Sequence, residues 1–448
     1  MSQNIMKYLL IINACIFLSL SAFAQETLSL SDAIEKALNN SYNIKSANTN
    51  VAISEKNNNW GEAGRMPTIT TSFQNSNTYN SIQNPTSFLN GADVLGSNST
   101  VSADLQWTLF DGGRVKSSKQ RLATVVAQSK ADLQVIVDNT SLQVSKNYYN
   151  VLIQEKRLLM LAELLKLSRD KITYIEAKRA YGQAIEFDLL QVRDAYLNDS
   201  IQWVMQQTNY KNALQNLALL MGVEVTEDTD FKLGDSIRYE LKNYMFDELL
   251  DELKLNNRQI NAEKINIKIS EIDIELQKAN LLPRVIMGAN ISEQLNVARI
   301  EGKQPTIPNN WRGGTTTSAG LNFSLNYNIY NGGKINRAIE LADLRKNISE
   351  FSVKDIERRL SQQLKIAYNL FENQKNVLAL SREMLANSTR NLEIAEERFK
   401  AGTLNYFDFR TIQINYFRTV NTVQDAFLNA KNTELDMLLQ SGLLMKKD

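Results

Sequence analysis

The chain carries the same series of landmarks twice, 220 residues apart. Leu-Phe-Asp-Gly-Gly at 109–113 returns as Ile-Tyr-Asn-Gly-Gly at 329–333, and Met221-Gly222 returns as Ser441-Gly442. No net gap separates these landmarks, so the chain is a duplicated half-protein rather than an array of short repeats. We expect one structural repeat over 25–222, a second over 247–448, and a connector over 223–246 that lies halfway along the helices.

The first residues are typical of a secretory signal peptide. Lys7 supplies a positive start, an apolar stretch follows, and Ala22-Phe23-Ala24 fits a cleavage site, which predicts a signal peptide over 1–24. Cys15, the single cysteine, lies inside this segment. It faintly resembles a lipoprotein acylation site, but we favour a cysteine that is discarded with the signal.

The composition excludes several classes of function. The chain has no histidine, and outside the signal it has no cysteine, which removes thiolate chemistry and zinc sites built on these residues. The 50 Lys and Arg nearly cancel the 49 Asp and Glu, so no basic surface indicates nucleic acid. No phosphate-binding glycine loop or carboxylate constellation stands out. We therefore predict neither an enzyme nor a cofactor.

All five prolines fall in two windows, and the hydrophobic period changes there from helical to two-residue. Apolar and polar residues alternate over 101–109 and 321–329, and weaker alternation follows Pro67 and Pro283. These patterns predict one β-hairpin over about 66–110 and another over about 283–331. Each hairpin is expected to have strands of roughly ten residues joined by a loop rich in Asn, Ser, Gly and Pro, at about 78–98 in the first and about 296–316 in the second. Such strands often lie half-buried in a soluble sheet, but the signal peptide and the isolated hairpins favour membrane strands.

Four strands cannot close a barrel, and unpaired edges in lipid are costly, so the chain must assemble with further copies. Two copies supply eight strands and three supply twelve, and only the larger number leaves a channel. Geometry favours the trimer, although sequence does not count subunits. The polar strand positions would line the lumen: Ser102, Asp104, Gln106, Thr108, Asn322, Ser324, Asn326 and Asn328.

A proline-free stretch of about 70 residues follows each hairpin, over 112–181 and 332–401. Apolar residues recur there every seven positions, from Val137 to Ile172 and from Leu364 to Phe399, which predicts left-handed coiled-coil seams. Return helices of about 35 residues should follow Gly182 and Gly402, and a shorter helix should precede each hairpin, over 31–64 and 247–281. One long helix can then run beside a stacked pair of shorter ones.

These motifs resemble the TolC family of outer-membrane efflux proteins over nearly the whole mature chain. The resemblance rests on the two strand-to-helix motifs and on the paired segments Tyr-Gly-Gln-Ala-Ile-Glu-Phe-Asp at 181–188 and Ala-Gly-Thr-Leu-Asn-Tyr-Phe-Asp at 401–408. It implies an α+β membrane protein: a homotrimer in the cell outer membrane with a twelve-stranded barrel, continued by a periplasmic tunnel of antiparallel coiled-coil helices. It also implies a passive exit duct that docks to a periplasmic adaptor and to an inner-membrane pump of the resistance-nodulation-division, ABC or major facilitator type.

The resemblance also suggests functional residues at the helical turns. Adaptor docking is expected around Gly182, Gln183, Ala184, Gly402, Thr403 and Leu404. Asp408 matches the family's acidic ring at the closed entrance, where like charges would attract cations. A second acid expected one turn later is replaced by Thr411, with Arg410 beside it, which predicts a weaker ring. Asp188 and Asp408 also suit helix N-terminal caps, and the two roles are compatible.

The alternative to a channel is a structural or adhesive coiled-coil protein of the cell surface. Such a protein would need neither polar-lined strands nor duplicated turn motifs. The repeat therefore favours the conduit.

Overall fold

A computed structural model describes residues 27–224, 231–237, 239, 241–302 and 310–445 of the chain. The signal peptide predicted over 1–24, including Cys15, lies outside the described residues. The chain divides into two compact units. The helical unit comprises Met1–Thr49, Asp132–Asn261 and Asp355–Asp448, and the sheet unit comprises Asn50–Ala131 and Ala262–Lys354.

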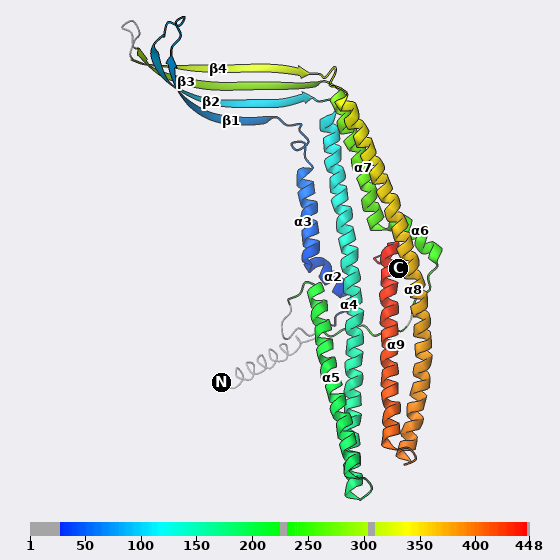
Figure 1. The fold of residues 1–448 in the computed structure, drawn as a ribbon. Helices are drawn as coiled ribbons and strands as arrows, with labels where there is room; N and C mark the ends of the chain where they lie inside the picture. Colours follow the sequence, from blue (N-terminus) through cyan, green and yellow to red (C-terminus); the bar gives the residue numbers. More distant parts are fainter. Residues whose placement is uncertain (1–26, 225–230, 238, 240, 303–309, 446–448) are drawn as a thin grey trace, which may run out of the picture. The chain divides into compact units, whose positions relative to one another are not determined.

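The sheet unit contains an antiparallel sheet in the order β1-β2-β3-β4 (Figure 1). Its strands are β1 (Thr68–Ile82), β2 (Ala92–Phe110), β3 (Arg284–Gly302) and β4 (Asn310–Asn326). The strands contain 15 to 19 residues, which is longer than the ten or so expected from the alternating segments. The outer parts of the two segments that we expected to be loops, 78–82, 92–98, 296–302 and 310–316, instead continue the ladder, because backbone pairing with the neighbouring strand does not depend on side-chain type.

Each strand-to-helix motif leads into a helix of 67 residues, α4 (Arg114–Ala180) and α8 (Lys334–Lys400). The return helices are α5 (Glu186–Leu220) and α9 (Tyr406–Ser441). The predicted seven-residue seams are buried in part: Val144, Leu364 and Phe371 are at 0% exposure, whereas Leu158, Ile172 and Leu392 are half-buried. Among the described residues, no helix is both long enough and apolar enough to cross a membrane.

The helix predicted before each hairpin is two helices in the structure. The first pair is α2 (Leu30–Asn40) and α3 (Tyr42–Asn57), and the second is α6 (Phe246–Asn256) and α7 (Arg258–Lys278), followed by the 3-10 turn η1 (Ala279–Leu281). The break at Asn257 is held by its side chain, which caps Ile260 at 3.0 Å and donates to the Gln440 carbonyl at 2.8 Å. The seven-residue pattern could not show these breaks, because their partners lie at the end of the return helix.

Each break lies against the glycine that ends a return helix. A Cβ on Gly222 would come within 2.9 Å of the Asn40 backbone, and one on Gly442 within 2.8 Å of the Asn256 backbone. The two asparagines are 216 residues apart rather than 220. The helices before the two hairpins therefore correspond at an offset of 216 residues, four fewer than the rest of the repeat. Despite this shift, each asparagine contacts the glycine of its own repeat in the same way.

The described part of the connector packs against helices of both repeats within the helical unit. Leu28 and Leu233 form a parallel bridge, and Asp235 accepts hydrogen bonds from the Leu30 amide at 2.9 Å and the Tyr148 hydroxyl at 2.7 Å. Farther along, Tyr239 packs on Phe427 with ring centroids 5.0 Å apart. The connector thus contacts α4 of the first repeat and α9 of the second.

Candidate functional site

The two helical turns share one backbone geometry. Gly182 and Gly402 adopt φ of 72° and 73°, the left-handed region that ends a helix without penalty for glycine. The next amides, of Gln183 and Thr403, each donate at 2.9 Å to the carbonyls of Lys178 and Arg398. Both turns are therefore rigid helix ends rather than loose loops.

Exposed apolar side chains surround these glycines. Tyr181 is 83% exposed, and Ile185, Phe187 and Phe407 are each more than 60% exposed. Ala184 and Leu404, which the resemblance placed among the docking residues, are half-buried and pack against the small clusters beneath the turns. The surface available to a partner is therefore the glycine backbone with the aromatic and aliphatic side chains beside it.

Asp188 and Asp408 both lie in the first turn of a return helix. The Asp188 carboxylate accepts the Ile185 amide at 3.0 Å. At the other turn, Asn405 caps the Asp408 amide at 2.8 Å and donates its own side-chain amide to the Asp408 carboxylate at 2.8 Å. Asp408 is exposed and Asp188 is half-buried. Both carboxylates thus stabilise a helix start, and Asp408 additionally keeps its charge at the surface.

Arg410 points away from Asp408. Its guanidinium pairs with Asp199 on α5 and donates to Gln413 at 2.9 Å. The two charged side chains are 12% and 6% exposed, and Ser168 on α4 donates a further hydrogen bond to Asp199. Thr411, in contrast, is exposed and donates its hydroxyl to the Phe407 carbonyl at 3.0 Å.

Sequence reasoning missed Asp199. Its signal was available, because Asp199 falls on the buried stripe of α5 with Val192, Gln206 and Ala213 at seven-residue spacing. A charged residue at such a position requires a buried partner. The sequence did not identify that partner, since Arg410 lies 211 residues away.

A cationic side chain also fills the space beneath the second turn. The Lys171 ammonium lies 4.1 Å from the centre of the Phe399 ring and 5.0 Å from that of Phe409. Burial lowers the pKa of Lys171, and burial raises the pKa of Tyr406 nearby. These contacts join α4 of the first repeat to both helices of the second by cation–π attraction.

A groove of about 730 Å³ opens beside the Asp199–Arg410 pair. Its lining includes Gln191, Asp194 and Asp199 of α5 and Phe407, Arg410 and Arg418 of α9. The groove thus has charged walls of both signs and lies where the two repeats meet.

The predicted lumen residues share one face of the sheet unit. The strand register places Ser102 in a row with Ser72, Ser292 and Ser318, and places Asp104 in a row with Thr70, Asn290 and Gly320. The Ser72 and Ser102 hydroxyls are 2.9 Å apart, and Ser102 donates to Asp104 at 2.8 Å. Gln106, Thr108, Asn322, Ser324 and Asn326 lie on the same strands, whereas Asn328 lies beyond the end of β4, so its strand placement was wrong.

The opposite face is apolar over the same rows. One row contains Ile69, Leu105, Ala289 and Leu321, and the next contains Thr71, Ala103, Ile291 and Ala319. Leu321, Phe323 and Ile69 are each more than 60% exposed. The sheet therefore separates a polar surface from an apolar surface that the described residues leave uncovered.

Comparison with known proteins agrees with this architecture. A family model described as outer membrane efflux protein matches residues 33–223 and 249–439, one match for each repeat. No curated protein matches the chain.

Several solved structures share the fold. CusC has a TM-score of 0.70 at 14% identity, covering 92% of both chains. The CmeC outer membrane channel of Campylobacter jejuni has a TM-score of 0.71 at 15% identity, covering 94% of this chain and 87% of that one. The open-state MtrE outer membrane channel of Neisseria gonorrhoeae has a TM-score of 0.67 at 17% identity, covering 94% and 90%.

Proposed function

Because the chain belongs to the outer membrane efflux protein family, we propose that it forms the exit duct of a tripartite efflux or type I secretion system. The observation that carries this proposal is the two-faced sheet. Rows of Ser, Thr, Asn and Gln run across all four strands, and rows of Leu, Ile and Ala lie behind them. Such a sheet suits an aqueous lumen on one side and lipid on the other.

The working form is a homotrimer. β1 and β4 are the edges of the sheet, and an edge in lipid leaves backbone groups unpaired at a cost of several kcal/mol each. Three copies would join these edges into a twelve-stranded barrel with the rows of Ser102 and Asp104 facing the lumen. The helical units of the three copies would then form the periplasmic tunnel.

The partners are a periplasmic adaptor and an inner-membrane pump. The turns at Gly182 and Gly402 support this assignment, since they present bare backbone beside exposed apolar groups such as Tyr181 and Phe407. Exposed apolar groups around a rigid turn are typical of protein docking surfaces. Gln183 and Thr403, the residues next to these glycines, would contact the adaptor first.

The entrance gate is a ring of Asp408 carboxylates, one from each copy. The ion pair between Arg410 and Asp199 supports this role. Because Arg410 is held by Asp199, it does not neutralise the exposed Asp408 carboxylate nearby in the sequence. Three like charges at a constriction would favour cations over anions. Asp188, which is half-buried and serves as a cap, is the matched residue in the other repeat.

The test is to purify the chain from outer membranes in detergent, measure its mass, and record currents in planar bilayers. We expect a trimer with cation-selective conductance, and a monomer without conductance would contradict the duct. Asp408→Ala should reduce the cation preference measured from the reversal potential, whereas Asp188→Ala should not. Unchanged selectivity in a conducting Asp408→Ala channel would refute the gate alone.

A further inference from the structure

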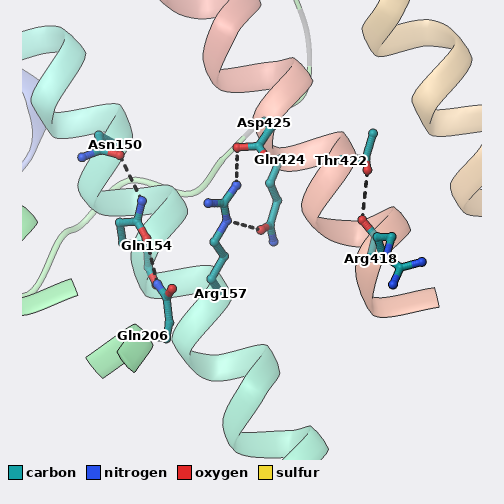
Figure 2. A network of polar contacts seen from close by, with 8 residues as sticks. All are labelled: Asn150, Gln154, Arg157, Gln206, Arg418, Thr422, Gln424 and Asp425. Carbon is teal, nitrogen blue, oxygen red and sulfur yellow. Dashed lines mark hydrogen bonds and ion pairs between the residues drawn. The ribbon is translucent and has the colours of Figure 1, made fainter. Parts of the chain in front are cut away.

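An arginine on the polar face of the sheet unit keeps its charge unpaired within the described part of the chain. Figure 2 shows the opposite case in the helical unit, where Arg157 on α4 reaches Asp425 and donates to Gln424 at 3.1 Å. Arg312 on β4 has only a long hydrogen bond, from its Nε to the side-chain oxygen of Asn310 at 3.5 Å. No carboxylate among the described residues pairs with Arg312, and its side chain is exposed. Its guanidinium is therefore free to bind a group from outside the chain.

Arg312 borders a hollow of about 470 Å³ in this face. Two neighbouring rows of the strand register surround the hollow, with Gly96, Ala298 and Arg312 in one row and Asn98, Asn296 and Gly314 in the next. The small residues leave room between the longer side chains. A Cβ placed on Gly314, for example, would have nothing within 4 Å.

Two amide side chains beside the hollow have their oxygens engaged. The Asn98 oxygen accepts the Thr100 hydroxyl at 3.3 Å, and the Asn296 oxygen accepts the side-chain amide of Gln294 at 3.1 Å. Each asparagine therefore has its amide nitrogen left to donate, and neither nitrogen has an acceptor among the described residues. The hollow thus combines one guanidinium with two amide donors, and no carboxylate is among its described lining residues.

We infer that this hollow binds an oxyanion, the carboxylate or phosphate group of a small solute. A guanidinium donates two parallel hydrogen bonds to such a group, and the amide donors can satisfy its remaining lone pairs. Asn98 lies 12 residues before Phe110, where β2 ends, so the hollow is about 40 Å along the strand from the strand-to-helix motif. The site is therefore separate from the helical turns and from Asp408.

That the bound group belongs to a solute in passage rests on the proposed duct, whereas the hollow itself is a feature of the sheet alone. Three copies would carry three such hollows on the lumen surface, all remote from the strand-to-helix motifs. Arg312 is exposed to water, so the affinity should be weak, and a weak site lets a solute leave as well as enter. The lumen would thus retain acidic solutes longer than uncharged ones.

The first test measures the binding of inorganic phosphate to the full chain, purified in detergent, from the line width in phosphorus NMR. Arg312→Gln should weaken phosphate binding about ten- to a hundredfold, the loss expected for charge-assisted hydrogen bonds. Arg284→Gln is the matched control, because Arg284 lies on the same face at the other end of β3 and donates to Thr108 at 3.4 Å. Equal losses in the two variants would mean that phosphate responds to the charge of the whole face, and would overturn the site.

The second test fills the hollow without removing a charge. Gly314 has no positive φ, and valine suits a strand, so the sheet should form normally in Gly314→Val. This variant should nevertheless weaken phosphate binding at least tenfold. Gly313→Val is its control, because a Cβ on Gly313 points to the opposite face, 3.6 Å from the Val297 side chain, and phosphate binding should be unchanged.

The outcomes separate the site from the duct. A conducting trimer that binds no phosphate, or whose phosphate binding survives both Arg312→Gln and Gly314→Val, would overturn the oxyanion site and leave the duct intact. A monomer without conductance that still binds phosphate through Arg312 would refute the duct and retain the site.

Discussion

Gly442 illustrates how a single residue can be required for two separate reasons. Its φ of 76° is in the left-handed region, and a Cβ there would lie 2.8 Å from the Asn256 carbonyl carbon and oxygen. Gly402 has a similar φ of 73°, but nothing lies within 4 Å of a Cβ placed on it. Comparing Gly402 with Gly442 therefore distinguishes the effect of backbone strain, which both positions share, from the effect of close packing, which only Gly442 has.

We expect Gly402→Ala to cost about 1–2 kcal/mol of unfolding free energy, the penalty of the left-handed region for a residue with a Cβ. Gly442→Ala should cost about 1–3 kcal/mol more, because backbone atoms rather than a flexible side chain must move. Urea unfolding followed by circular dichroism measures both. Equal losses in the two variants would mean that the contact with Asn256 contributes nothing.

At the scale of elements, the pair of Asp199 and Arg410 joins α5 to α9 and so connects the two return helices. Both charges are almost fully buried, and burying charges costs several kcal/mol before their attraction offsets it. The ion pair therefore contributes more to the specificity of the contact between α5 and α9 than to its net stability. It also explains why Arg410 does not reach Asp408.

Removing one partner should be far worse than removing both. Asp199→Thr strands the Arg410 charge and should cost about 3–5 kcal/mol, and Arg410→Leu should cost a similar amount because it strands the Asp199 charge. The double variant Asp199→Thr with Arg410→Leu, which installs the residues at the counterpart positions Thr419 and Leu190, should recover more than half of that loss. Thermal unfolding of the single and double variants measures the coupling, and additive losses would argue against a coupled pair.

At the scale of the whole molecule, the two faces of the sheet decide how the chain enters a membrane. Leu105 and Gln106 are neighbours on β2 that point to opposite faces, in rows of apolar and polar residues respectively. Leu105→Arg should cost about 2–4 kcal/mol in lipid and reduce the amount of protein in outer-membrane fractions. Gln106→Arg should insert normally and lower cation conductance, and the reverse outcome would mean that the faces are assigned the wrong way round.

Much of the fold could be predicted because its determinants are local. Alternation over 101–109 and 321–329 marked the strands, and the seven-residue series marked helices that the structure shows as α4 and α8. The predicted TolC-like α+β architecture is confirmed. The strand ends were not predictable, because polar segments near 78–98 look like loops until a neighbouring strand pairs with them.

The candidate site was predictable only in part. The turn glycines and the acidic residues Asp188 and Asp408 stand in repeated motifs, so their positions at the helix ends followed from the sequence. The partners of charged residues did not, because Asp199 and Arg410 meet only when two distant helices pack. The same holds for Ala184 and Leu404, which share the motifs but turn inward.

The sequence by itself determined the duplication, the two-faced strands and the length of the helices, since each is a periodic pattern carried by neighbouring residues. Only the tertiary structure decided which apolar stripe of α8 is buried and which is exposed. Both stripes have coiled-coil spacing, and burial depends on which helices stand beside them. On α8, Leu364 and Phe371 are fully buried, whereas Ile366 and Val377 are 57% and 39% exposed.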